Sequence, residues 1–209
     1  MADTTQRDVE AMWVAAIGET SLPVTRGDDG RPKVAFGAPL PVGIAADGEY
    51  LDLILTERWP VWRVRDALEP VLPDGWTLRD LVDVWLGAPT LAAAVAGADY
   101  RITLGGTAGA TAIATAAASM LTEATLPRTR AKGTGTVAYD LRPLLVRLAV
   151  VDAGPSTVVM ARTRFHQTLG SGRPDEVVAA LAERVDGTLD VATVVRERLL
   201  LTTEVDAGD

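Results

Sequence analysis

The residues best placed to do chemistry are basic side chains that recur at every second position in two short segments. The two runs are Arg128, Arg130 and Lys132, and Arg162, Arg164 and His166. Residues two apart share one face of a β-strand, so each run projects its charges together. Neighbouring cations destabilise a strand unless an anion lies close to them. The runs therefore predict either a surface for an anionic partner or cations that the protein's own carboxylates neutralise.

The charge of the chain is unevenly distributed. The whole sequence carries −8, which argues against a general nucleic-acid binder. Between Leu126 and His166, however, seven arginine and lysine residues face two aspartates, a net charge of +5. This contrast favours a confined basic surface. The residues predicted to form it are Arg128, Arg130, Lys132, Arg142, Arg162 and Arg164, with Arg31 and Lys33 at its edge.

Other groups that could act on a substrate are few. The chain has no cysteine, which excludes disulfides and thiolate zinc sites within it. His166 is the only histidine, so a histidine-rich metal site cannot form. Glu49 and Asp52 are three apart on a predicted strand and point to opposite faces, so they cannot act as an acid–base pair. We therefore predict no catalytic residue, no bound metal and no cofactor.

A glycine-rich segment, Leu104–Ala110, follows a predicted strand and begins a predicted helix. This context is typical of dinucleotide-binding loops, but the full G-x-G-x-x-G spacing is absent. We interpret the segment as a strand-to-helix connection.

Periodic apolar residues predict the elements that position these side chains. In the first half the expected elements are a helix over 7–17, strands over 33–36 and 49–56, a helix beginning at Pro60, and a strand over 76–86. In the second half they are a short helix over 90–96, a strand over 100–104, a helix over 110–121, strands over 126–132, 144–151 and 157–166, a helix over 174–185, and a strand over 191–201.

This order predicts an α+β protein with two ferredoxin-like (split βαβ) units in tandem, the first lacking its opening strand. The expected boundaries are 1–88 for the first half, 89–203 for the second and 204–209 for a flexible tail. No apolar run approaches the roughly 18–20 residues of a membrane-spanning helix, and no secretory signal is visible. We therefore expect a soluble, cytoplasmic protein without a membrane partner.

Several segments, in the same order along the chain, resemble the radical SAM-linked family known as DUF2344. They are Arg31–Gly37 (RPKVAFG), Pro39–Gly43 (PLPVG), Gly48–Asp52 (GEYLD), Ala88–Leu91 (APTL), Arg128–Gly133 (RTRAKG), Tyr139–Pro143 (YDLRP) and Gly172–Val177 (GRPDEV). The similarity spans about residues 10–201. The family's usual opening strand, with its Ser-His-Leu-Asp-like segment, has no counterpart in residues 1–6.

The resemblance implies an accessory domain that works beside a radical SAM enzyme, near RNA or a ribosomal component. Our leading hypothesis is a non-catalytic recognition module that presents a basic surface to an anionic partner. Two alternatives remain. One is an enzyme that acts on a nucleotide or RNA through Asp52 and Asp140 with Arg142. The other is a homo-oligomer that uses an exposed sheet edge or a face built from Trp59, Trp62, Trp76 and Trp85.

Overall fold

The computed structural model describes residues 5–133 and 135–207, without the side chains of residues 6, 131 and 132. Its contacts divide the chain into two compact units. Unit 1 comprises Met1–Gly43 and Tyr50–Ala94, and unit 2 comprises Ile44–Glu49 and Val95–Asp209. The short segment 44–49 therefore belongs to unit 2, although its flanking residues on both sides belong to unit 1.

Unit 1 is built from short elements around a small core. Its elements are α1 (Gln6–Gly18), β1 (Val34–Phe36), β3 (Leu51–Leu53), α2 (Val61–Leu68), the 3-10 turn η1 (Glu69–Val71) and α3 (Leu91–Ala94). A capping box begins α1, because the Thr5 hydroxyl accepts the Asp8 N–H and the Asp8 carboxylate accepts the Thr5 N–H. β1 and β3 form an antiparallel pair. The core residues are Ile17, Leu22, Val24, Val64 and Leu68.

The strand predicted over Trp76–Leu86 is wrong, because the structure forms no strand there. Arg65 donates to the carbonyl groups of Leu78 and Arg79, each at 3.3 Å, and so occupies acceptors that a strand ladder would use. Trp76 packs edge-on against Trp13, with ring centroids 5.5 Å apart. Among the described residues of unit 1, the two-stranded β1–β3 pair is the one sheet, so a tandem of two ferredoxin-like units is not confirmed.

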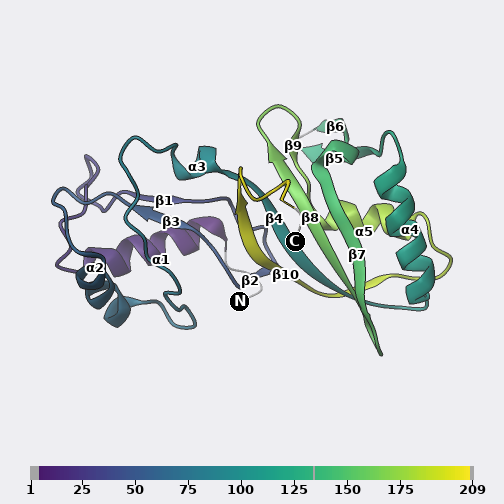
Figure 1. Cartoon of the computed structure of the whole chain (residues 1–209), viewed down its shortest axis with the longest axis horizontal. Coiled ribbons are helices and arrows are strands. Elements are labelled where there is room, and N and C mark those ends of the chain that lie inside the picture. Colours follow the sequence, from purple (N-terminus) through teal and green to yellow (C-terminus); the bar gives the residue numbers. More distant parts are fainter. Residues whose placement is uncertain (1–4, 134, 208–209) are drawn as a thin grey trace. The chain divides into compact units, whose positions relative to one another are not determined.

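Unit 2 has the predicted β-α-β-β-α-β order with a hairpin inserted after its first helix. The main elements are β4 (Val95–Gly105), α4 (Ala110–Thr122), β7 (Leu145–Ala153), β8 (Thr157–His166), α5 (Pro174–Ala182) and β10 (Asp190–Leu201). The inserted hairpin is β5 (Pro127–Lys132) with β6 (Gly135–Asp140), and the 3-10 turn η2 (Arg142–Leu144) follows it. The chain is therefore of mixed α+β class (Figure 1).

One six-stranded sheet dominates unit 2. Its strands follow the order β2-β10-β4-β8-β7, where β2 is Ala45–Ala46, and the two-residue β9 (Gly170–Ser171) pairs with β8. Neighbouring strands are antiparallel except for β2, which runs parallel to β10. No helix among the described residues has the length and apolar character needed to cross a membrane.

The sheet has two different faces. The helices α4 and α5 cover one of them, and the side chains of β4 that point to it are almost completely buried: Ala98, Tyr100, Ile102 and Leu104. The intervening residues of β4, among them Asp99 and Arg101, project from the opposite side, which we call the open face. Residues 202–207 turn back toward the sheet after β10, and Val205 is only 1% exposed. Of the predicted flexible tail 204–209, the structure describes residues 204–207, in which Val205 is buried and Asp206 and Ala207 are exposed.

A glycine with a positive φ connects β4 to α4. Gly106 has φ +106°, and a Cβ added there would lie 2.2 Å from the Thr188 carbonyl oxygen. We expect Gly106→Ala to lower the free energy of unfolding by about 1–3 kcal/mol, measured by urea denaturation. Gly109→Ala is the control, because Gly109 has φ −72° and open space around its Cβ position. An equal loss in both variants would contradict the role of Thr188.

Candidate functional site on the open face of the unit 2 sheet

Arg128, the first of the predicted surface cations, is neutralised within the protein. Its Nε donates to Glu176 at 3.1 Å and its Nη1 to Glu183 at 2.6 Å, and its side chain is only 14% exposed. The hydrogen bonds to Glu183 and Glu176 raise the pKa of Arg128 further, against a smaller opposing effect of burial. Both carboxylates come from the region of α5. Arg128 is therefore neutralised by the protein's own carboxylates, which was one of the two predictions for this run of basic residues.

The other cations of this segment also have local roles. Arg130 lies over the Tyr139 ring, 5.1 Å from its centroid. Arg142 donates to the Leu121 carbonyl at 2.6 Å and the Leu145 carbonyl at 2.8 Å, which ties α4 to the start of β7. The side chain of Lys132 lies outside the described part of the chain. The first basic run thus includes cations that support the fold.

The remaining predicted cations lie in different places. Arg31 and Lys33 belong to unit 1, where Arg31 approaches Asp29 at 3.8 Å and remains 76% exposed. In unit 2, Arg164 pairs with Asp206. His166 accepts the N–H groups of two residues in the turn after β8, each at 3.2 Å, which explains this histidine as a turn residue.

Arg162 belongs to a set of charged residues that crosses the sheet. The strand register places Arg147 of β7 opposite Arg162, Arg162 opposite Asp99 of β4, and Asp99 opposite Arg198 of β10. We call these four residues the charged row. Strands lie about 4.8 Å apart, so the row extends across roughly 14 Å of the open face. Three arginines and one aspartate give it a formal charge of +2.

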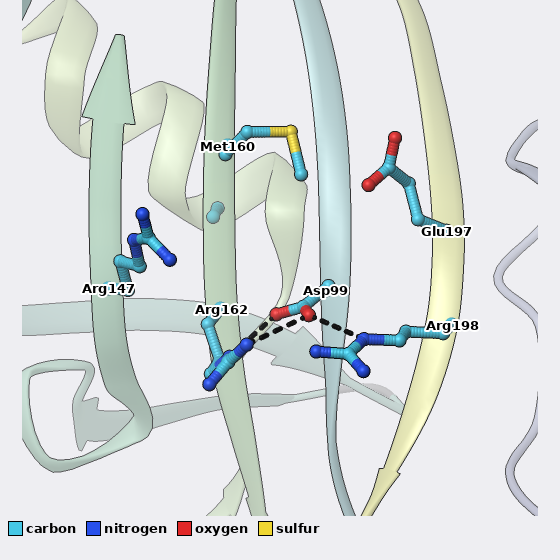
Figure 2. A pocket seen from close by; sticks show the side chains of 7 residues that line it. Asp99, Arg147, Met160, Arg162, Glu197 and Arg198 are labelled. Carbon is cyan, nitrogen blue, oxygen red and sulfur yellow. Dashed lines mark hydrogen bonds and ion pairs between the residues drawn. The ribbon is translucent and has the colours of Figure 1, made fainter. Parts of the chain in front are cut away.

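Asp99 holds the centre of the charged row. Its carboxylate accepts Arg162 Nε at 2.8 Å and Nη2 at 3.1 Å, and Arg198 Nε at 3.0 Å (Figure 2). The Asp99 side chain is 13% exposed and that of Arg162 is 6% exposed. Burial favours a higher pKa for Asp99, but the hydrogen bonds and charges of the two arginines outweigh it and lower this pKa. Asp99 therefore stays ionised and fixes both guanidinium groups.

A β-bulge in β10 places Arg198 on the open face. The register with β4 shifts between Arg196 and Arg198, so Glu197 is an extra residue in the strand. Arg196 is fully buried on the helix-covered face beside Tyr100, whereas Glu197 and Arg198 both line the open face. Glu197 accepts Arg101 Nε at 2.8 Å.

A shallow depression of about 270 Å³ lies over the charged row. Its lining includes all four residues of the row together with Met160, Ala161 and Glu197. Figure 2 shows Arg147 at one side of it and Arg198 at the other, with Asp99 and Arg162 joined between them. Arg162 Nη1 also donates to the Ala207 carbonyl at 2.8 Å, which brings the turn after β10 to the same face.

Arg198 keeps unused hydrogen-bonding capacity beside the depression. Its Nε is bound to Asp99, and its side chain is 50% exposed. Within the described residues, no acceptor is recorded for its Nη1 and Nη2 groups. These two nitrogens present a planar pair of donors whose position is set by Asp99. A phosphate or carboxylate matches such a pair of donors.

The residues of the alternative enzyme hypothesis do not line this depression. Asp140 accepts the N–H groups of Leu126 at 2.7 Å and Arg142 at 2.9 Å, and so fixes the end of the β5–β6 hairpin. Asp52 lies on β3 of unit 1, where burial raises its pKa. No group of three potential metal-ligating side chains was found among the described residues.

The glycine-rich connection after β4 also has internal partners. The N–H groups of Thr107 and Ala108 both donate to the Thr188 carbonyl at 3.2 Å. Donors of this kind hold the pyrophosphate in a dinucleotide loop, and here they bind the protein itself. The segment therefore serves to join β4 to α4.

The four tryptophans of the oligomer hypothesis are not equally exposed. Trp76 packs on Trp13, and Trp59 packs against the unit 1 core under the Arg63 guanidinium, which lies 3.8 Å from the ring centroid. Trp62 and Trp85 are exposed, at 65% and 79%.

A family model described as an uncharacterized protein conserved in bacteria (DUF2344) matches residues 5–182. No curated protein matches the chain.

Proposed function

We propose that this chain, which belongs to the DUF2344 family, is a non-catalytic recognition module that works beside a radical SAM enzyme. In this proposal the open face of unit 2 is the surface that binds an anionic partner. The charged row is the observation that carries this proposal. The part concerning the radical SAM enzyme, and an RNA or ribosomal partner, follows from the family resemblance described above.

The electrostatics of the open face support an anionic partner. Three arginines of the row meet one aspartate, and Arg147 stands directly opposite Arg162 on the neighbouring strand. Arg198 is half-exposed beside the depression and keeps two donor nitrogens that can bind an anion. Arginine is well suited to this task because its charge is permanent and its guanidinium binds phosphate or carboxylate through two parallel hydrogen bonds.

The arrangement of unit 2 supports a recognition role. A β-α-β-β-α-β unit with helices on one face leaves the other face of its sheet available, and we propose that unit 2 is a ferredoxin-like module used in this way. The residues that line the depression include no aromatic side chain. Recognition of bases by stacking is therefore not expected here, and contacts with the anionic backbone dominate.

A co-purification experiment tests this function. The full chain is immobilised, exposed to total RNA and to a radical SAM enzyme of the same organism, and washed at low and high salt. We expect retention of the enzyme, and retention of an anionic partner that falls steeply as salt rises. The double variant Arg147→Gln/Arg198→Gln should release the anionic partner while it keeps the enzyme. Retention of neither by the wild-type chain would remove the proposal.

A further inference from the structure

We infer that residues 202–207, the turn after β10, occupy a docking site for an acidic peptide segment of a partner, and that the partner displaces them when it binds. We call these residues the acidic turn. The site lies on the open face beside the charged row, where Arg162 and Arg164 of β8 contact the turn. The inference rests on the proposed function, because it specifies the anionic partner as a protein segment that carries an apolar side chain next to carboxylates.

Two arginines of β8 hold the acidic turn. The Arg164 guanidinium forms two hydrogen bonds with the Asp206 carboxylate, one of them from Nη1 at 3.3 Å. Arg162 Nη1 donates to the Ala207 carbonyl at 2.8 Å. Because the two arginines are two residues apart on one strand, both project from the open face. The second basic run predicted from the sequence is therefore covered in part by an acidic segment of the chain itself.

An apolar contact fixes the middle of the acidic turn. Val205 is 1% exposed, and its Cγ2 lies over Gly97 of β4, where an added Cβ would be 3.1 Å from it. Gly97 stands opposite Arg164 in the strand register, so the apolar contact lies beside that guanidinium. The site thus matches an apolar side chain flanked by carboxylates, which is the pattern of Glu204, Val205 and Asp206.

The acidic turn can leave the sheet without losing its own hydrogen bonds. The Glu204 and Val205 N–H groups donate to the Leu201 carbonyl at 2.8 and 3.2 Å, and the Ala207 N–H donates to the Glu204 carbonyl at 3.2 Å. These bonds lie within the turn and the last residue of β10. The Asp206 side chain is 68% exposed, and an ion pair so exposed adds little to stability. Such a turn can open while the strands below it stay paired.

The chemistry of the site favours an acidic peptide over nucleic acid. Val205 fills its place with an aliphatic side chain, and a phosphate backbone has no such group. The contact between Arg164 and Asp206 is a guanidinium–carboxylate pair with two hydrogen bonds, which an aspartate or glutamate of a partner can repeat. A tethered segment acts at a local concentration on the order of millimolar. The acidic turn therefore keeps the site closed to weak anionic ligands.

The reactivity of a single cysteine tests whether the acidic turn opens. The chain has no cysteine of its own, so Val205→Cys in the full chain can be labelled by iodoacetamide at one position. Val177→Cys is the matched control, because it makes the same change at a residue of α5 that is 0% exposed. We expect Val205→Cys to react on the order of a hundredfold faster, since local opening requires less free energy than global unfolding. Equal rates would overturn the inference.

Peptide binding tests what the site accepts. The probe is a labelled peptide with blocked ends and the sequence of residues 201–207, titrated against the full chain by fluorescence anisotropy. Val205→Ser should bind it about tenfold more tightly than the wild type, because apparent affinity rises with the fraction of open sites. Asp206→Asn should bind it about two- to fivefold more tightly, since an exposed pair contributes less. Because Asp206 is exposed, this second variant tests the opening even if Val205→Ser is unstable.

Two further variants locate the site. Arg164→Gln, added to Val205→Ser, should weaken probe binding about tenfold, because the contact through two hydrogen bonds is lost. Asp175→Asn is the matched control for Asp206→Asn. Asp175 also forms an exposed pair with one arginine, Arg173, at the start of α5. This control should bind the probe like the wild type.

Three results of the binding experiments would also overturn the inference. Probe affinities of Val205→Ser and Asp206→Asn equal to that of the wild type would show that the acidic turn does not occupy the site. Undiminished binding after Arg164→Gln would place the site elsewhere. A gain of Val205→Ser in affinity for labelled oligouridylate, without a gain for the peptide, would identify nucleic acid as the partner.

The co-purification experiment separates these outcomes from the proposed function. If the acidic turn competes with the partner, Val205→Ser should retain more of the anionic partner than the wild type does. Equal retention by both chains would refute the inference and leave the proposed function standing. Retention of no anionic partner by either chain would count against both.

Discussion

Glu49→Ala is expected to lower the free energy of unfolding of unit 2 by about 3–5 kcal/mol. Glu49 binds Arg196 through two hydrogen bonds, from Nε at 2.7 Å and Nη2 at 2.5 Å, and the Arg196 side chain is 1% exposed. Burial raises the pKa of Glu49, against the hydrogen bonds and charge of Arg196 that lower it. Removing this carboxylate leaves a guanidinium that cannot lose its proton inside the protein, which is the costly case for a buried pair.

Urea denaturation of the full chain measures this loss. Glu197→Ala is the control, because Glu197 lies on the same strand but pairs with Arg101 at the surface, where its side chain is 34% exposed. A surface pair contributes below about 1 kcal/mol. The double variant Glu49→Leu/Arg196→Met should recover most of the stability, since an apolar pair of similar volume leaves no buried charge. A loss in Glu49→Ala no larger than in Glu197→Ala would refute the role of this pair.

Asp99→Ala should be the second most damaging substitution, with a loss of about 3 kcal/mol at neutral pH. It removes the acceptor of three hydrogen bonds and leaves the largely buried Arg162 beside Arg147 and Arg198 with no carboxylate between them. The substitution should also weaken the retention of an anionic partner under the proposed function, because the position of Arg198 is no longer fixed.

The pH dependence of this loss has a definite sign. The pKa of Asp99 is lowered in the folded protein from the ordinary value of 3.8, so its contribution is fully present above 3.8 and disappears as pH falls through the folded pKa. Unfolding free energies of wild type and Asp99→Ala, measured from neutral pH downward, should therefore converge below pH 3.8. Asp206→Ala, which removes the exposed partner of Arg164, should show little loss at any pH. A gap that persists at the acid end would contradict the ionised state of Asp99.

The elements of unit 2 could be predicted because each carries a local pattern. Alternating apolar residues identify β4, β7, β8 and β10, and their order with α4 and α5 is as predicted. The same reasoning failed at Trp76–Leu86. Alternation leads to a strand only if an adjacent strand provides backbone hydrogen-bond partners. There, Arg65 takes two of the carbonyl groups. Local sequence does not reveal such a competitor from α2.

The charged row illustrates what the sequence could not show. Arg162 was predicted as a surface cation from its neighbours along one strand. Its partners Arg147, Asp99 and Arg198 lie on other strands and become neighbours only through register. The bulge at Glu197 adds a second obstacle, because a period of two assigns Arg196 and Arg198 to one face, whereas the structure separates them. The counter-ions of Arg128 were equally hidden, since they lie about fifty residues further along the chain.

The pairing of residues 44–49 with β10 has a practical consequence for anyone who divides this protein. The polypeptide passes between the two units three times, after residues 43, 49 and 94, so no single cleavage separates them. A fragment that starts at Val95 would lack β2, expose the β10 edge to pairing with other chains and leave Arg196 without Glu49. A protease nick after Ala94 should yield two pieces that migrate together on a native gel and separate only in denaturant. Genetic dissection of this protein therefore has to carry the 44–49 segment with the C-terminal piece.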